Sequence, residues 1–382
     1  MMQNVFTNAR VVLADRVLNT GSVVTDNDGR ICAIAPGKSG AAGAIDCDGD
    51  YLIPGLVELH TDNLEKHATP RPKTEWPAIA AVIAHDSQLA VSGITTVFDA
   101  IALGSVDKTG TRIQQLERMV DGISEARDQQ LLRADHLLHL RCEISYPSLK
   151  DIFDPLVSHP LLRLVSVMDH TPGQRQFVSE AHYRTYYQGK FGLSDPEMDA
   201  FTEDRKRDHE TYGDLHRRHV VSVCRQRNIS LASHDDATEE HVDAAVADGM
   251  SIAEFPTTIE AARASHAAGM KVMMGGPNLV RGKSHSGNVS AGDLARADVL
   301  DIVSSDYIPS SMLHAAFKLG AETGHADLPK AIRTVSKTPA EAAGLTDRGE
   351  IAVGKRADLV RVRHTPYHPL VNGVWREGQR IA

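Results

Sequence analysis

The chain has 382 residues, of which 42% are hydrophobic, and a formal net charge of -9. This length fits one large domain of about 200 to 300 residues with a smaller appended unit. The acidic balance argues against a protein that coats nucleic acid through its general surface charge.

The N-terminal segment and the cysteines exclude further classes. The chain begins MMQNVFTNARVVLADRV, which lacks a basic start followed by an unbroken apolar core, and no apolar run approaches the roughly 18 residues of a membrane span. The four cysteines are far apart and lack CxxC spacing, so they indicate neither a disulfide framework nor a zinc finger. We therefore expect a cytoplasmic protein with no membrane and no nucleic-acid partner.

Both ends of the chain have sequence patterns typical of short strands. Runs such as VFTNARVVLA and GSVVTDNDGRICAIA are separated by turn residues, and strand texture returns late in GEIAVGKRADLVRV. We infer that residues 1–54 and 347–382 form one composite β-sandwich domain beside a central domain of residues 55–346.

The central segment alternates strand-like runs with segments of helical period, which predicts repeated βα units and a parallel sheet. The candidate strands are LVELH (56–60), ITTVFDA (94–100), HLLHLRCEI (136–144), LRLVSVMDH (162–170), ISLASHD (229–235), SIAEF (251–255), KVMMGG (271–276) and LDIVSSD (300–306). Eight βα units predict an α/β fold with a TIM-like (β/α)8 barrel, whose active site lies at the carboxyl ends of the strands.

Metal-type side chains follow five of these strands. The candidate ligands are His60, Asp62, Glu143, His170, His234 and Asp306. His60 and Asp62 share one side of an extended segment because they are two residues apart. Two imidazoles and a carboxylate can hold one divalent ion, and a bridging carboxylate brings a second ion to within about 4 Å. Six candidates at one rim therefore predict a two-metal hydrolytic site.

Other histidines are assigned to packing or to solvent. A lone histidine at a strand end is more often a hydrogen-bonded packing residue than a ligand. The histidines assigned to packing are His85, His136, His139 and His159. The polar segment 195–219 predicts an exposed helix. Its histidines, which we expect to face solvent, are His209, His216 and His219.

Several motifs resemble a known family. IPGLVELHTD, with the late ADLV segment, is similar to the amidohydrolase superfamily of metal-dependent hydrolases, which have a barrel and a composite β-sandwich. HTDNLEKHATPRP, MDHTPGQRQF, ASHDDAT, GGPNLVRGKSHSGNV and SSDYIPSS resemble its diphosphatases of the carbon-phosphorus lyase pathway, over nearly the whole chain. The resemblance implies hydrolysis of a sugar 5-triphosphate to the 5-phosphate and pyrophosphate in phosphonate catabolism, and it is compatible with a homodimer.

The chain departs from the superfamily in three places. Its first motif is HTD rather than His-x-His, and the bridging lysine carbamate frequent in the superfamily has no obvious counterpart, so Glu143 is the candidate bridging ligand. The sixth strand ends in AEF where many relatives have a histidine. Two interpretations stay open: His170 supplies the missing imidazole, and Glu254 lies behind the ligands.

The loops after the strands carry many cations although the chain as a whole is acidic. Cations on one barrel face suit a polyphosphate, which arginine binds bidentately and lysine binds as a point charge. In PNLVRGKSHSGN, Gly282 and Gly287 let backbone amides approach phosphate oxygens closely. The predicted substrate-binding residues are Lys66, His67, Arg71, Arg175, Asn278, Arg281, Lys283 and His285.

The predicted reaction is hydrolysis by water that divalent metals activate. Metal binding lowers the pKa of water to about 7 and offsets charge on the attacked phosphorus. Asp306 is the predicted catalytic residue, which orients or deprotonates the water, and the acid that protonates the leaving group stays open between Asp306 and a loop histidine such as His67 or His285. Mixed nitrogen and oxygen ligands suit Zn, Mn or Fe.

Two other functions stay open. An amidohydrolase that acts on a cyclic amide or amine would use the same water on carbon, but it has little need for so many cations around the mouth. In a non-catalytic scaffold of a pathway complex, we would expect the metal-binding side chains to be replaced by other residue types. All six positions here carry ligand-type side chains.

Overall fold

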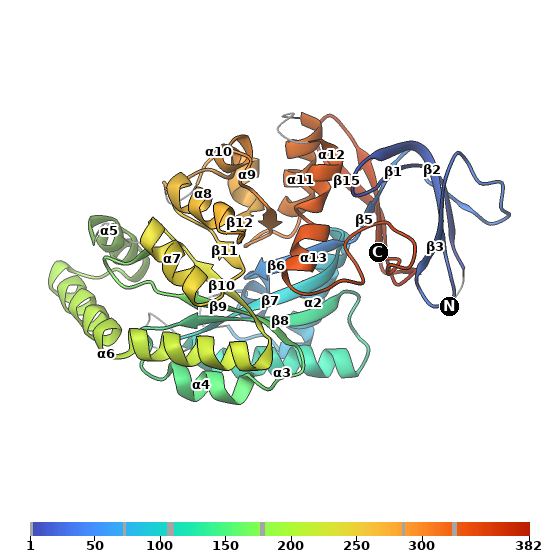
Figure 1. Ribbon diagram of the computed structural model, residues 1–382. Helices are drawn as coiled ribbons and strands as arrows, with labels where there is room; N and C mark the ends of the chain where they lie inside the picture. The colour runs from blue at the N-terminus through green and yellow to red at the C-terminus, as the bar shows by residue number, and fades with distance from the viewer. Residues whose placement is uncertain (1–2, 72–73, 105–110, 176–179, 285–286, 323–326) are drawn as a thin grey trace.

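The computed structural model describes residues 3–71, 74–104, 111–175, 180–284, 287–322 and 327–382. These residues contain two eight-stranded sheets. Figure 1 shows one sheet surrounded by helices and the other beside it, with both chain ends in the second sheet.

The first sheet is the predicted barrel. Its strands follow chain order and every neighbouring pair is parallel. The strands are β6 (Leu56–Thr61), β7 (Ile94–Leu103), β8 (Asp135–Glu143), β9 (Leu162–Met168), β10 (Ser230–His234), β11 (Ile252–Glu254), β12 (Lys271–Gly275) and β13 (Ile302–Ser304). They correspond one for one to the eight candidate strands, so the prediction of a (β/α)8 barrel is confirmed.

The barrel closes where the first strand meets the last. The backbone N–H of Asp62 donates to the Asp306 carbonyl at 2.8 Å, and the Asp306 N–H donates to the His60 carbonyl at 3.0 Å. Below this bridge the buried Glu58 carboxylate accepts the N–H groups of His60 at 2.6 Å and of Ser305 at 2.5 Å. Burial raises the pKa of Glu58 to about 7. Backbone hydrogen bonds thus place three of the predicted site residues side by side.

The barrel interior is a packed apolar core with a contribution from every strand. Its strand residues are Val57, Leu59, Phe98, Leu137, Leu164, Ala232, Ile252, Met273 and Ile302. Strand β7 is buried along its whole length, as expected for a parallel strand covered on both faces. This core forms a floor, and the polar residues at the strand ends lie above it.

The helices are α1 (Asn63–Ala68), α2 (Ala78–Val91), α3 (Thr111–Asp128), α4 (Leu149–Leu156), α5 (Glu180–Phe191), α6 (Asp195–Arg227), α7 (Glu239–Ala247), α8 (Ile259–Ala267), α9 (Gly276–Arg281), α10 (Ala291–Arg296), α11 (Ser311–Phe317), α12 (Leu328–Arg333) and α13 (Lys337–Ala342). A π-helical turn, Lys318–Glu322, follows α11. Several barrel helices begin at a side-chain cap. Thr258 accepts the Ala261 N–H at 3.1 Å, for example, and Asp327 accepts the Lys330 N–H at 2.7 Å.

Helix α6 is longer and better packed than its polar sequence predicts. A capping box between Ser194 and Glu197 starts it. The expectation that its three histidines face solvent is wrong for His216, because the helix packs on the barrel through one side, whereas His209 and His219 are partly exposed. His216 is buried, with Nδ1 3.0 Å from the Ile144 carbonyl oxygen. The other two pair with carboxylates: His209 lies 2.9 Å from Asp169, and His219 lies 2.6 Å from Asp154.

The second sheet combines both chain ends in the order β16-β15-β14-β5-β1-β2-β3, with β4 paired to β1. Its strands are β1 (Val5–Val12), β2 (Val17–Thr25), β3 (Ile31–Pro36), β4 (Ile45–Asp46), β5 (Tyr51–Pro54), β14 (Leu359–His364), β15 (Pro369–Arg376) and β16 (Gln379–Arg380). Antiparallel pairing of β14 with β5 joins the two ends of the chain. The two chain ends therefore share one continuous sheet rather than the two separate sheets that the predicted β-sandwich implies, and the division into domains at residues 54 and 346 stays a prediction.

Apolar packing joins this sheet to the barrel. Val360 and Val374 of the end sheet belong to the same buried cluster as Leu56 of β6, Leu89 of α2 and Phe317 of α11. This cluster is separate from the barrel interior and packs the end sheet against β6, α2 and α11. In the part of the chain that the structure describes, no helix has both the length and the apolar composition needed to cross a membrane.

Candidate metal centre

A cavity of about 320 Å³ opens at the carboxyl ends of the barrel strands. The six predicted metal residues all line it: His60, Asp62, Glu143, His170, His234 and Asp306. The structure thus brings together side chains from five different strand ends, which is the convergence that the barrel geometry predicts.

One group of ligand-type atoms lies at the barrel closure. The group consists of His60, Asp62 and Asp306, whose candidate ligand atoms lie within 4.8 Å of one another. The Nε2 atom of His60 is 3.8 Å from a carboxylate oxygen of Asp62. Asp306 has a φ of 55°, in the left-handed region that aspartate tolerates better than most residues.

A second group lies across the cavity and contains a residue that the sequence reasoning did not single out. His170, His234 and Asp235 bring their candidate ligand atoms within 4.8 Å of one another. One carboxylate oxygen of Asp235 is 3.7 Å from Nε2 of His170 and 3.4 Å from Nε2 of His234. The available signal was the ASHDDAT motif, in which Asp235 directly follows His234.

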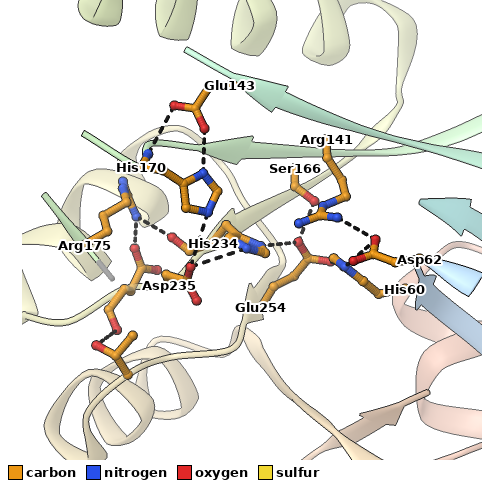
Figure 2. A network of polar contacts seen from close by, with 12 residues as sticks. His60, Asp62, Arg141, Glu143, Ser166, His170, Arg175, His234, Asp235 and Glu254 are labelled. Atoms are coloured by element: carbon orange, nitrogen blue, oxygen red, sulfur yellow. Dashed lines mark hydrogen bonds and ion pairs between the residues drawn. The ribbon is translucent and has the colours of Figure 1, made fainter. Parts of the chain in front are cut away.

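Glu254, at the end of β11, tethers one histidine from each group. Its carboxylate oxygens lie 3.2 Å from Nδ1 of His60 and 3.1 Å from Nδ1 of His234, and the hydroxyl of Ser166 donates to it as well. Figure 2 shows this carboxylate between the two imidazoles. With Nδ1 bound in this way, the Nε2 atom of each ring is left toward the cavity. These contacts favour the interpretation that Glu254 lies behind the ligands.

Electrostatics around Glu254 keep it ionised. Burial alone would raise its pKa, but the neighbouring imidazoles of His139 and His60 outweigh that effect and hold the pKa well below the ordinary range. Burial also lowers the pKa of His60, and Glu254 with Asp62 raises it overall. The centre therefore concentrates negative charge, and a cation between the two groups would offset it.

Glu143 makes a similar tether for the remaining histidine. One of its oxygens is 2.5 Å from Nδ1 of His170, and the other accepts the Ser145 hydroxyl at 2.9 Å and the His170 N–H at 3.1 Å. Both oxygens are thus engaged with neighbouring residues, as Figure 2 shows for the His170 contact. This arrangement orients His170 so that Nε2 faces Asp235.

Arg141 on β8 adds a partly buried cation to the cavity wall, with its side chain 11% exposed. Its guanidinium donates to the Asp62 carboxylate at 2.5 Å, and its Nε atom is buried without a hydrogen-bond partner among the described residues. Arg141 and Glu143 are two residues apart on one strand, so both face the cavity. That spacing was the sequence signal for Arg141.

The donor set fits a divalent metal centre. Three imidazole Nε2 atoms and three carboxylates, those of Asp62, Asp235 and Asp306, meet around one cavity. Carboxylates hold the other nitrogen of each imidazole, which is the usual support of metal-ligating histidines. Such mixed nitrogen and oxygen donors suit Zn, Mn or Fe.

Two of the predicted substrate-binding residues line the cavity. Arg281, the last residue of α9, is exposed at its edge. The Asn278 side chain accepts the Ala291 N–H at 2.9 Å and donates to the Val289 carbonyl at 3.3 Å, so it holds the loop after β12 in place.

Among the residues that the structure describes, the other predicted cations do not line this cavity. Lys66 donates to the carbonyl of Tyr307, whose side chain forms part of the wall. His67 contacts Gln88 on α2 at 3.0 Å. Arg175 is buried and pairs with Asp236. Arg71 and Lys283 are exposed outside the lining, and His285 falls outside the residues that the structure describes.

The cavity wall also contains Tyr187, Asn288 and Tyr307, which the sequence reasoning missed.

Comparisons with known proteins identify related sequences and similar folds. The sequence profile of the amidohydrolase family matches residues 197–381. Alpha-D-ribose 1-methylphosphonate 5-triphosphate diphosphatase of Escherichia coli (strain K12) is 47% identical over 378 residues, which span 99% of this chain and 100% of that protein.

Solved structures share the fold at low identity. The 5-methylcytosine deaminase of Klebsiella pneumoniae superposes with a TM-score of 0.63 at 16% identity, covering 100% of this chain and 98% of that one. N-acetylglucosamine-6-phosphate deacetylase of Pasteurella multocida superposes with a TM-score of 0.60 at 15% identity, covering 99% of each chain. The family resemblance inferred from the sequence motifs is confirmed. The chain belongs to the amidohydrolase family and groups there with the Escherichia coli diphosphatase.

Proposed function

We propose that this protein is a metal-dependent diphosphatase that hydrolyses alpha-D-ribose 1-methylphosphonate 5-triphosphate to the 5-phosphate and pyrophosphate. The observation that carries the proposal is the 47% identity to the Escherichia coli diphosphatase over 99% of the chain. The convergence of all six candidate ligands on one cavity supports it, because a scaffold without activity would have no need to keep them.

The proposed centre holds two divalent ions. His60, Asp62 and Asp306 would hold one ion, and the second group, His170, His234 and Asp235, would hold the other. A divalent cation in such a site lowers the pKa of bound water and offsets the charge that develops on phosphoryl oxygens. Glu143 was expected to bridge the ions, but its contacts with His170 and Ser145 support an orienting role instead.

Asp306 is the proposed acid and base. Its backbone is fixed by the bridge to His60 and Asp62, and its side chain lines the cavity. A carboxylate in this position can accept a proton from the attacking water and deliver it to the departing pyrophosphate. Attack at the α-phosphorus leaves one phosphate on the sugar and releases the outer two as pyrophosphate.

Cations at the rim would hold the triphosphate. Arg281 lines the cavity and presents a guanidinium that can bind phosphate oxygens in a bidentate manner. Lys66 does not line the cavity, but its ammonium lies 5.2 Å from the centre of the ring of Tyr307, which does. We assign the inner phosphates to the metal ions and the outer phosphates to these side chains.

The direct test is phosphorus NMR of the metal-reconstituted protein with the sugar triphosphate. Pyrophosphate and the sugar 5-phosphate should appear with wild type, and an Asp306→Asn variant should leave the triphosphate signals in place. A matched control is His219→Gln, since the pair of His219 with Asp154 lies outside the cavity.

One result would overturn the proposed function, and another would overturn the proposed site of attack. In the first, the triphosphate spectrum stays unchanged with Zn, Mn and Fe in turn, and cyclic amides become the substrates to screen. In the second, the reaction in ¹⁸O-labelled water places the label only in pyrophosphate, which contradicts attack at the α-phosphorus.

A further inference from the structure

A second cluster of histidines and carboxylates lies behind the cavity wall, between α2 and strands β7 and β8. Its members are His85 and Asp86 of α2, Asp99 of β7 and His136 of β8. Each of the four side chains is at most 1% exposed. The metal chemistry proposed above uses none of them.

The hydrogen-bond partners of the two imidazoles determine which ring nitrogens in this cluster carry protons. The two oxygens of Asp99 lie 2.8 Å from Nε2 of His85 and 2.8 Å from Nδ1 of His136. The other nitrogen of His136 lies 3.3 Å from Asp86, which also accepts two backbone N–H groups, those of Arg133 and Ala134. An ionised carboxylate only accepts, so each ring nitrogen facing one must donate. His136 is therefore doubly protonated, and His85 carries its proton on Nε2.

The charges of the cluster agree with this assignment. Burial opposes the charged form of His136, but Asp99 and Asp86 outweigh it and raise its pKa to about 9. Burial lowers the pKa of His85 despite the contact with Asp99. The result is one charged and one neutral imidazole on the same carboxylate.

The neutral His85 presents an acceptor toward the catalytic side. Its Nδ1 atom is 3.0 Å from the side-chain amide nitrogen of Asn63, the first residue of α1. The same amide nitrogen donates to Gln88 of α2 at 2.9 Å. Both amide hydrogens of Asn63 are thus used on α2, and Asn63 is 3% exposed.

Asn63 directly follows Asp62, a candidate metal ligand. The N–H of Asp62 is held by the Asp306 carbonyl at 2.8 Å, and the next side chain is held by α2. The backbone of Asp62 is thereby fixed on one side by the barrel closure and on the other by His85. The Asp62 carboxylate accepts a hydrogen bond from Arg141 and lies 3.8 Å from Nε2 of His60.

We propose that Asn63 and His85 are positioning residues for Asp62, and that Asp99 and His136 serve them by fixing the tautomer of His85. This inference deepens the proposed function and rests on it, because Asp62 is placed there in one of the two metal groups. The reverse tautomer of His85 would aim an N–H at the Asn63 amide, and the clamp on α1 would be lost.

The test is metal retention by Asn63→Ala in the metal-loaded full chain, measured by dialysis against increasing chelator. Loss of an orienting contact behind a metal ligand typically weakens metal affinity by about 10 to 100-fold. We expect a loss in this range for one of the two ions, with the second ion retained as in wild type. The control is His219→Gln, which removes a histidine–carboxylate pair far from α1 and should retain both ions.

A pair of substitutions at position 85 separates positioning from bulk packing. His85→Asn can keep an acceptor near the Nδ1 position, whereas His85→Gln can keep a donor to Asp99 but places no acceptor there. We expect His85→Asn to retain metal better than His85→Gln, although both lose side-chain volume. Equal retention by the two variants, or wild-type retention by Asn63→Ala, would overturn the proposal. Metal content is read without substrate, so this outcome is independent of whether pyrophosphate is released.

Discussion

The metal cavity and the cluster behind it use the same two residue types in opposite ways. At the cavity, His170 and His234 each have Nδ1 hydrogen-bonded to a glutamate, while Nε2 lies 3.7 Å and 3.4 Å, respectively, from the Asp235 carboxylate. In the cluster, both nitrogens of His136 lie within hydrogen-bond distance of carboxylates. Histidines become ligands where one ring nitrogen is held and the other left available. The residue type alone does not distinguish the two regions.

The largest effect should follow from removing the proposed acid and base at the cavity. Asp306→Asn should lower the rate of pyrophosphate release by about 10² to 10⁴-fold, the usual contribution of general acid and base catalysis. The thermal midpoint should stay within a few degrees of wild type, because the backbone bridge of Asp306 is unaffected. If the variant kept a tenth or more of the wild-type activity, Asp306 would not be the acid and base of the reaction.

The cluster of His85, Asp86, Asp99 and His136 should affect the free energy of unfolding more than the rate of pyrophosphate release. The pKa of His136 is raised to about 9, so its contribution is fully present below about pH 6.5 and is lost as the pH rises through about 9. The shift corresponds to about 3 kcal/mol of unfolding free energy. Urea denaturation at pH 6 and at pH 10 should show this loss in wild type and a smaller loss in His136→Gln. Parallel pH profiles would contradict a charged His136.

The tether at the cavity should control metal affinity. Glu254→Gln leaves one oxygen that can accept from an imidazole, so only one of His60 and His234 can keep its contact. We expect metal affinity to fall by about 10 to 100-fold. Metal content after dialysis against a chelator measures this loss. Metal retention equal to wild type would show that the imidazoles need no carboxylate behind them.

The smallest effect should separate the cations that line the cavity from those that do not. Arg281→Ala should raise KM for the triphosphate by about 10-fold, because a hydrogen bond to a charged group contributes about 1.5 to 3 kcal/mol. Arg71→Ala should change KM by less than about twofold, since Arg71 is exposed and outside the lining. Steady-state kinetics of the two variants provide a matched comparison. A larger effect at Arg71 would place the triphosphate further from α9.

Much of the fold followed from local patterns. Eight apolar runs alternating with helical segments predict parallel strands, and the carboxyl ends of parallel strands meet at one rim. His60 and Asp306 could therefore be placed together although they lie 246 positions apart in the chain. The predictions failed for residues whose local sequence is compatible with either a buried or an exposed position. His216 sits in a polar segment yet is buried, because helix packing rather than local polarity decides its environment.

The sequence by itself determined the eight strands, the joining of the two chain ends and the six ligand-type residues at one rim, because periodicity and strand direction are local properties. Only the tertiary structure decided which nitrogen of each imidazole contacts a glutamate, that Glu254 holds two histidines, and that Asp235 completes the second group. It also buried Arg175 against Asp236 rather than at the cavity. These roles depend on partners from distant strands at distances of a few ångströms, and local sequence patterns do not encode such distances.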